Sequence, residues 1–307
     1  MLPIRLLPRL SHRPWGVRSL RPWLEVDAHG EPLGEAWFTD NRTDTGDGRT
    51  LGDIIAADRA RVLGAQVMGD RCPLLMKLLF TTERLSIQVH PDDAYGQAHH
   101  QSLGKTEAWH VLSATDDAEV GLGLTAPTTP EAAREAARSG ALEHQVDWRR
   151  AQVGDTFFVP AGTIHAIGGG LTIVEVQEHS DVTYRLYDYG RPRELHLEHG
   201  FAVATLDRYT VDNTPTMLAP NRTLLTTCPY FTMERVRVRQ ATQVVPAGDE
   251  YQLLMALEGS GTLAGEPFRP GTAWLVPAVG DVTDIVTGDA TFLLAYRGVA
   301  PSRVLRA

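Results

Sequence analysis

Glycine and proline interrupt this chain so often that they leave room mainly for short extended segments. The 307 residues include 28 glycines and 19 prolines, and short apolar or alternating stretches run between them. Such stretches, bounded by turn residues, are typical of strands in a β-sandwich or β-barrel. Residues 156–159, 171–176 and 231–238 are clear examples. We therefore expect an all-β protein.

Helices are expected to be few and peripheral. The best-defined helix begins after Thr129, a suitable N-cap that is followed by proline, and ends at Gly140. A second helix is expected over residues 51–63, and shorter ones after Asp92 and Glu194.

A weak internal repeat divides the chain. Residues 154–161, a glycine turn followed by a strand and a Pro-Ala stop, are echoed by residues 271–278, which no histidine follows closely. This self-similarity suggests two related β units. We place the boundary in the polar stretch 212–216, which gives a metal-binding catalytic unit over residues 1–212 and a metal-free unit over residues 213–307.

Charge and composition exclude several classes of function. A formal net charge of −9 argues against nucleic-acid binding, which needs clustered Lys and Arg. No apolar run approaches the length of a membrane span, so we expect no membrane partner. Cys72 and Cys228 lie far apart and each precedes a proline, so we expect a reducing compartment, the cytoplasm.

Potential metal ligands gather in three short segments. Gln88 and His90 are two residues apart, so in a strand they point to the same face, and Glu107 and His165 follow in later segments. A single histidine is more often structural, and Glu107 alone could be an exposed partner of Lys105. Two imidazoles, a carboxylate and an amide oxygen together favour a divalent metal with an open coordination position.

Cationic side chains near these ligands suggest chemistry on an anion. Lys105 shares a strand face with Glu107, and a metal and burial would both lower the pKa of Lys105, which would suit proton transfer near neutral pH. Arg185 follows a strand and is a suitable partner for a phosphate or another planar oxyanion, and Arg191 could extend the same patch.

Four sequence blocks occur in a fixed order: SIQVHPDD from Ser86, GKTEAW from Gly104, VPAGTIHAI from Val159 and SDVTYRLYDYGR from Ser180. Together they resemble the type I mannose-6-phosphate isomerases, most closely the short bacterial form. The resemblance runs from about residue 34 to Arg191. It implies a fold of the cupin superfamily, all-β, with two cupin-like jelly-roll β-barrel units and a few peripheral helices.

The resemblance also implies an activity and a site. The activity is a zinc-dependent aldose–ketose isomerisation of mannose 6-phosphate and fructose 6-phosphate through an enediol, with one zinc ion per chain. The implied zinc ligands are Gln88, His90, Glu107 and His165. The implied catalytic residues are Lys105, Arg185 and Asp181, and the implied substrate-binding residues are Ser86, Glu175 and Arg191. We expect Lys105 to carry the proton, with Asp181 as the alternative.

Two other functions stay open. His90, Glu107 and His165 alone also form the two-histidine, one-carboxylate set of non-haem iron dioxygenases. Gln88 as an added ligand argues against that class, and so do the cationic residues Lys105, Arg185 and Arg191. The second alternative is a non-catalytic sugar-phosphate-binding protein on the same fold. The expected partner is a small-molecule sugar phosphate, and the sequence leaves a monomer and a homodimer equally open.

Overall fold

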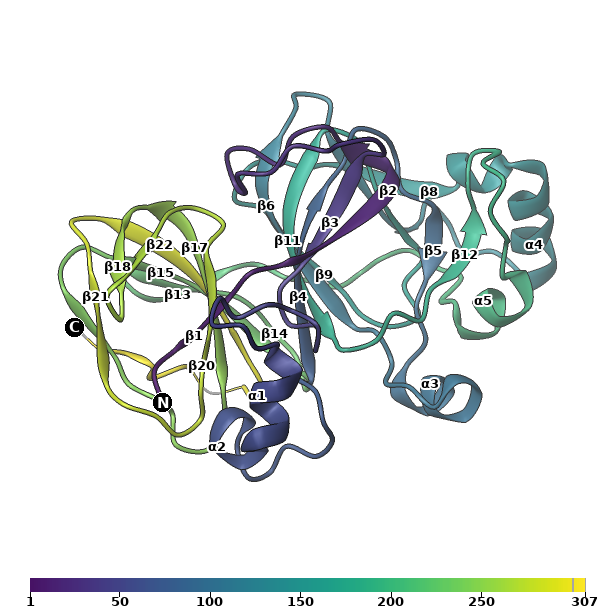
Figure 1. The fold of residues 1–307 in the computed structure, drawn as a ribbon. Coiled ribbons are helices and arrows are strands. Elements are labelled where there is room, and N and C mark those ends of the chain that lie inside the picture. Colours follow the sequence, from purple (N-terminus) through teal and green to yellow (C-terminus); the bar gives the residue numbers. More distant parts are fainter. Residues whose placement is uncertain (300, 307) are drawn as a thin grey trace.

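Strands dominate this protein and helices are few, which confirms the expected class. The computed structural model describes residues 1–299 and 301–306. Two β-rich units lie side by side, with helices at their margins (Figure 1). The strands expected from the sequence over residues 156–159, 171–176 and 231–238 are all present.

The N-terminal unit is built from two antiparallel sheets. Its six-stranded sheet has the order β2 (Arg9–Val17), β3 (Leu33–Trp37), β4 (Leu74–Phe80), β11 (Leu171–Glu178), β6 (Glu107–Ala114) and β9 (Thr156–Val159). Its five-stranded sheet has the order β12 (Tyr184–Tyr187), β5 (Ile87–Val89), β10 (His165–Ile167), β7 (Glu119–Leu124) and β8 (Val146–Arg150). The sheets face each other, because Trp109 and Ile173 of the first share one buried cluster with Val120 and Leu122 of the second.

The C-terminal unit repeats this arrangement. Its seven-stranded sheet has the order β1 (Ile4–Leu6), β20 (Ala273–Val276), β17 (Gln252–Gly259), β22 (Ala290–Tyr296), β15 (Thr232–Val238), β14 (Arg222–Thr227) and β13 (Thr216–Ala219). Its five-stranded sheet has the order β19 (Glu266–Phe268), β18 (Gly261–Leu263), β21 (Thr283–Val286), β16 (Thr242–Val244) and β23 (Leu305–Arg306). Although β1 opens the chain, Ile4 pairs with Leu275, so β1 belongs by its pairing to this unit.

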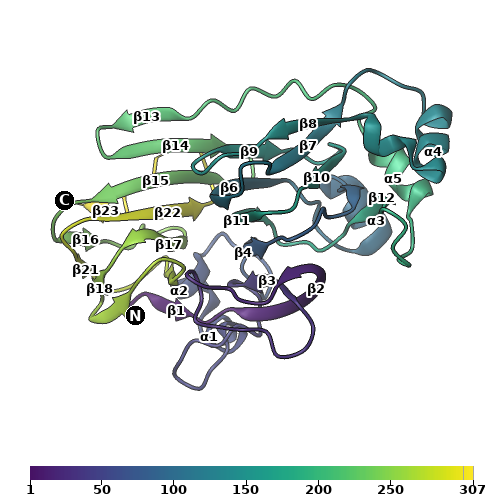
Figure 2. The same ribbon diagram turned by 90° about the horizontal axis from the view of Figure 1, so that it is seen from above.

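The two units share a core. The large sheets of both contribute to one buried cluster, in which Met76 and Val174 of the N-terminal unit lie with Met233, Met255 and Leu293 of the C-terminal unit. Seen from above, β6 and β9 lie next to β14 and β15 (Figure 2). A common core of this kind fixes the orientation of the two units, because separating them would expose large apolar side chains to water.

The hydrogen-bonded strand orders are open. Among the described residues, β2 and β9 form the two edges of the six-stranded sheet, and no pairing closes it into a barrel. The units are therefore described as pairs of packed sheets.

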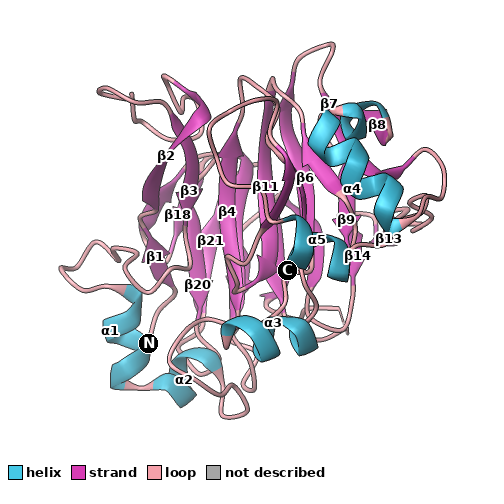
Figure 3. Ribbon diagram, turned by 90° about the vertical axis from the view of Figure 1, so that its right-hand side faces the viewer, coloured by secondary structure: helices cyan, strands magenta, loops and turns pink. Residues whose placement is uncertain are grey.

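The helices lie at the periphery, and all but the last begin after a residue whose side chain caps the first turn (Figure 3). They are α1 (Leu51–Ala57), α2 (Arg59–Leu63), α3 (Asp93–His100), α4 (Pro130–Ser139) and α5 (Leu197–Val203). The expected helix over residues 51–63 is divided, because Asp58 leaves the helical conformation and its side chain caps α2 at the Arg61 N–H. None of the helices in the described part of the chain has the length and apolar character needed to cross a membrane.

Candidate active site

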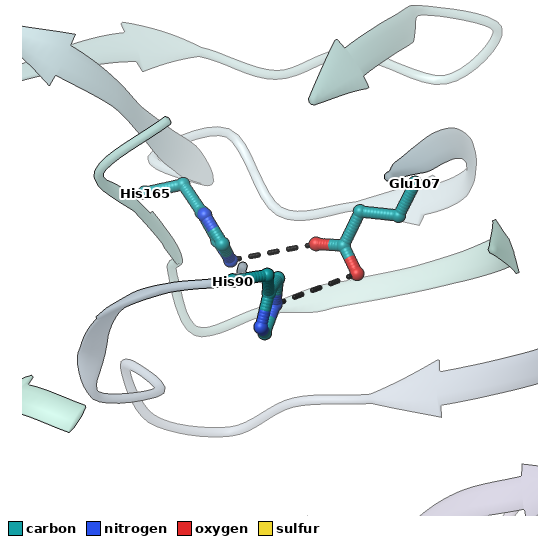
Figure 4. Close-up of side chains that lie close together, drawn as sticks. All are labelled: His90, Glu107 and His165. Atoms are coloured by element: carbon teal, nitrogen blue, oxygen red, sulfur yellow. Dashed lines mark ion pairs between the residues drawn. The ribbon is translucent and has the colours of Figure 1, made fainter. Parts of the chain in front are cut away.

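Strand pairing and sheet packing bring the expected metal ligands together. In the five-stranded sheet, His165 at the start of β10 lies directly opposite Gln88 on β5, and His90 follows β5. Glu107 is the first residue of β6 in the other sheet. The imidazoles and the carboxylate therefore meet between the two sheets of the N-terminal unit (Figure 4).

The cluster is compact and buried. His165 Nε2 lies 3.4 Å from Glu107 Oε1, and His90 Nε2 lies 3.7 Å from Glu107 Oε2. All three side chains are at most 1% exposed. One ligand-type atom from each residue lies within 4.8 Å of the other two. This separation suits donor atoms that share a single cation.

Hydrogen bonds fix the protonation of both imidazoles. His90 Nδ1 lies 3.0 Å from the carbonyl oxygen of Val182, and His165 Nδ1 lies 2.9 Å from that of Thr163. A carbonyl oxygen only accepts, so each Nδ1 carries the proton and each Nε2 presents a lone pair toward Glu107. Burial, reinforced by nearby Lys105, lowers the pKa of His90 to about 4, and burial also lowers the pKa of His165.

Glu107 completes a donor set that fits a divalent metal. Burial alone would raise its pKa, but the charge of Lys105 holds the pKa of Glu107 well below its usual range. Its Oε1 atom is buried and accepts no hydrogen bond from the described residues. A buried ionised oxygen without a partner is costly, and two neutral imidazoles beside it complete a coordination set.

Gln88 reaches the same cluster through its amide. Gln88 Nε2 lies 3.2 Å from His165 Nε2, and Ser86 Oγ donates to Gln88 Oε1 at 3.2 Å. A half-turn of the terminal amide group of Gln88 exchanges its oxygen and nitrogen atoms, so either atom can face the imidazole. Direct coordination of a metal by Gln88 stays a prediction.

Lys105 lies against the cluster, between two carboxylates. Its Nζ lies 3.0 Å from His90 Nε2, contacts the Glu107 carboxylate and is 4.0 Å from Glu175 Oε1. Burial lowers the pKa of Lys105, but Glu107 and Glu175 outweigh it, so the pKa is raised above its usual value. A bound metal would act in the opposite direction to these carboxylates, so the expectation of a lowered pKa beside a metal stays a prediction.

A cavity of about 460 Å³ opens next to the metal ligands. It brings together most of the expected site residues, namely Ser86, Gln88, Lys105, Glu175, Asp181 and Arg185. Arg191 is not among its lining residues. The Arg191 guanidinium donates to Glu83 at 2.9 Å and to Asp188 at 3.2 Å, and Arg193 reaches the cavity wall instead.

Comparisons with known proteins agree with this geometry. The family described as phosphomannose isomerase type I, catalytic domain, matches residues 5–129. The mannose-6-phosphate isomerase of Streptococcus mutans is 33% identical over 278 residues, which cover 85% of this chain and 86% of that protein. This chain belongs to the type I mannose-6-phosphate isomerase family.

Other relatives extend the match over nearly the whole chain. Mannose-6-phosphate isomerase ManA of Bacillus subtilis is 32% identical and covers 90% of this chain and 93% of its own length. The crystal structure of the mannose 6-phosphate isomerase from Bacillus subtilis superposes with a TM-score of 0.85 at 29% identity over 96% of this chain and 99% of that one. A putative mannosephosphate isomerase from Archaeoglobus fulgidus, at 19% identity and a TM-score of 0.78, shares the fold.

In this member of the family, sequence reasoning missed one buried cation of the cavity. Lys77 Nζ donates to Glu175 Oε1 at 3.1 Å and to Gln177 Oε1 at 2.7 Å, and it lies 4.4 Å from the ring centroid of Trp37. A signal was present. The chain contains only two lysines, Lys77 and Lys105, among many arginines, and both lysines line this cavity. Arg13, Glu35 and Arg193 also line it and were not expected.

Proposed function

We propose that this protein is a zinc-dependent isomerase that interconverts mannose 6-phosphate and fructose 6-phosphate. The observation that carries the proposal is the buried Glu107 Oε1 without a hydrogen-bond partner, which lies 3.4 Å from His165 Nε2, in a cluster with His90 beside a cavity. The similarity to mannose-6-phosphate isomerases of Streptococcus mutans and Bacillus subtilis supports the reaction.

His90, Glu107 and His165 would hold the metal, with Gln88 as a fourth ligand. Nitrogen and carboxylate donors of this kind suit zinc. When bound, the metal would polarise oxygen atoms of the sugar. The same donors would also accept non-haem iron, so the identity of the metal is part of the test.

The charge of the cavity supports a phosphorylated substrate. Five of its lining residues are cationic and three are acidic, in a chain whose overall charge is −9. The cationic residues are Arg13, Lys77, Lys105, Arg185 and Arg193, and the acidic ones are Glu35, Glu175 and Asp181. A cavity with excess positive charge concentrates an anionic ligand that the rest of the surface repels.

The proposed chemistry moves a proton between two neighbouring carbons. The reaction removes the proton beside the carbonyl, forms an enediol and returns the proton to the adjacent carbon. Lys105 is buried at the cavity wall and in its neutral form would accept this proton and then return it, a role for which a bound metal would lower its pKa, and Asp181 is the alternative carrier. Arg185 would stabilise negative charge on oxygen or bind the phosphate group. Ser86, Glu175 and Arg191 are proposed to position the sugar.

The proposal extends to the fold and to the place of action. We propose that each unit is a cupin-type jelly roll, because each consists of two facing antiparallel sheets and the first holds the metal ligands between them. A cytoplasmic location fits the two cysteines, which are both buried free thiols.

A coupled isomerase assay combined with metal analysis tests the function. We expect about one zinc per chain, loss of activity after chelation and recovery with zinc. The variant Glu107→Gln should lose the metal and more than about a hundredfold of the activity, since even partners of metal ligands are worth 10–100-fold. Glu198→Gln, which changes an exposed carboxylate, is the matched control.

Three outcomes would contradict the proposal. Full activity in metal-free protein would remove the metal from the mechanism. Oxygen uptake by the iron-loaded protein, without isomerisation, would favour a dioxygenase. Sugar-phosphate binding by zinc-replete protein without turnover would favour a binding protein.

A further inference from the structure

A second cavity, of about 540 Å³, lies between the large sheets of the two units. One wall comes from the N-terminal unit, with His110 and Leu112 on β6 and Gly154 before β9. The opposite wall comes from β13, β14, β15 and β17 of the C-terminal unit. Figure 2 shows β9 of the first wall next to β14 of the second. We call this cavity the inter-unit cleft.

The inter-unit cleft is separate from the cavity at the metal ligands. Glu107 and His110 lie on the same strand, β6, but Glu107 points between the two sheets of the N-terminal unit. Residues an odd number apart point to opposite faces of a strand, so His110 faces the C-terminal unit. The six-stranded sheet therefore stands between the two cavities, and they share no lining residue.

Positive charge is concentrated in this cleft. Four arginines and a single carboxylate, Glu258, are its charged lining residues. The arginines are Arg222, Arg235, Arg237 and Arg239. Arg235 and Arg237 alternate on β15 and Arg239 follows, so all three share a face. At roughly 3.3 Å per strand residue, the backbone positions of Arg235 and Arg239 are about 13 Å apart.

Half of these arginines are already neutralised. Arg237 donates to Asp289 at 2.8 Å, and Arg222 Nε donates to the buried Glu234. Arg235 and Arg239, in contrast, form no ion pair with any residue that the structure describes. Arg235 and Arg239, which flank Arg237, are therefore the two arginines of this face without an ion-pair partner among the described residues.

The neighbouring groups compensate this charge only in part. The Asp289 carboxylate that pairs with Arg237 also interacts with the charge of Arg239. Arg222 lies opposite Val236 in the strand pairing, so its side chain shares the other face of the sheet with its partner Glu234 and adds no free charge to the cleft. The carboxylate of Glu258 accepts a hydrogen bond from Thr291 at 2.9 Å. Burial, followed by the charge of Arg235, lowers the pKa of His110 to about 4, so His110 is neutral near pH 7 and adds no charge. The cleft thus presents positive charge above the apolar side chain of Leu257.

We propose that the inter-unit cleft binds a small molecule with two phosphate groups, at a site separate from the catalytic cavity. Guanidinium groups bind phosphate through paired hydrogen bonds. The backbone positions of Arg235 and Arg239 are about 13 Å apart, so in extended conformations their guanidinium groups suit two separate phosphate groups of one ligand.

Titration calorimetry with fructose 1,6-bisphosphate tests this site. It is run on the full chain at low salt, with mannose 6-phosphate in excess to occupy the catalytic cavity. We expect binding to the wild type that weakens with added salt. The double variant R235A/R239A should bind at least about tenfold more weakly, since losing one charge-assisted hydrogen bond exceeds 1.4 kcal/mol, a factor of ten.

A matched double variant separates the site from general charge. R138A/R208A removes two exposed arginines that have no side-chain partner among the described residues, and it should bind like the wild type. Isomerase activity and thermal unfolding of R235A/R239A should equal those of the wild type, which shows that the variant is folded. Inorganic phosphate should bind at least about tenfold more weakly than the bisphosphate.

The inference is overturned if the wild type does not bind millimolar bisphosphate, or if both double variants bind it equally. Equal affinity for inorganic phosphate would overturn the requirement for two phosphate groups. Because binding at the inter-unit cleft is measured independently of turnover, failure here is distinguishable from failure of the isomerase proposal.

Discussion

Lys77 and Glu175 face each other directly across the paired strands β4 and β11, and their side chains form a 3.1 Å ion pair. The Lys77 side chain is 3% exposed and the Glu175 side chain 5%. A buried charge of this kind depends on its partner, because removing the partner leaves the remaining charge in a medium that solvates it poorly. The pair therefore fixes one wall of the catalytic cavity.

The variant Lys77→Met should lower the free energy of unfolding by about 3 kcal/mol, because the buried Glu175 loses its nearest cation and keeps only Lys105, whose Nζ is 4.0 Å away. The double variant Lys77→Met/Glu175→Gln should recover part of this loss, since the poorly compensated carboxylate is also removed. Urea unfolding monitored by fluorescence measures both. Arg21→Met, which breaks an exposed pair with Glu25, serves as the control and should cost less than about 1 kcal/mol. A loss as small as that of the control would show that the buried pair contributes little.

The variant Lys105→Met should reduce kcat by about a hundredfold or more with little change in metal content, if Lys105 carries the proton. Lys105→Arg keeps the positive charge but cannot give up a proton near neutral pH. We therefore expect Lys105→Arg to be nearly as slow as Lys105→Met in the coupled assay. Near-normal turnover of Lys105→Met would exclude this lysine and move the role to Asp181. Recovery by Lys105→Arg would instead indicate a purely electrostatic role.

Capping residues in the sequence predicted the ends of those helices that depend mainly on local interactions. Thr129 caps α4 and Gly140 ends it with a φ of 84°, as proline, threonine and glycine at those positions indicate. Asp92 likewise caps α3. The same logic failed at Asp58, where one expected helix is two, because aspartate can end one helix and cap the next.

Long-range contacts were less accessible to sequence reasoning. The pairing of β1 with β20 joins residues at opposite ends of the chain, and nothing in the short run Ile4–Leu6 specifies its partner. Lys77 was missed because it lies within an otherwise apolar buried strand. Its role as an ion-pair partner can be inferred only once Glu175 is known to lie opposite it. The histidines and the glutamate of the candidate metal site were found because their residue types are informative even before their distances are known.

The variant Thr129→Ala should destabilise the protein by about 1 kcal/mol. The Thr129 hydroxyl accepts a hydrogen bond from the Ala132 N–H at 3.3 Å, and alanine leaves that donor without a side-chain partner. Thermal or urea unfolding measures the loss. Thr125→Ala removes an exposed hydroxyl outside the helix and should change stability by less than half as much. Equal effects of the two substitutions would show that the cap makes no specific contribution.

Glu178 should make stability fall as pH rises toward neutrality. Burial, with help from Asp93, raises its pKa to about 7, although the Thr106 N–H donates to Glu178 and lowers the pKa in part. The usual pKa of a glutamate is near 4.5, so between these two values the folded state holds a proton that the unfolded state has released. Stability is therefore greatest below the lower value, and it decreases up to about pH 7 by at most about 1.4 kcal/mol per pH unit.

The variant Glu178→Gln removes this titration and should lose less stability than the wild type between pH 5 and pH 7. Its amide oxygen can still accept the hydrogen bond from the Thr106 N–H, so the local geometry is retained. The measurement is the free energy of unfolding in urea at several pH values, with Glu131→Gln on the exposed first turn of α4 as the control. The control should keep the wild-type slope. If Glu178→Gln also keeps that slope, Glu178 is ionised in the folded state throughout this range and the raised pKa is wrong.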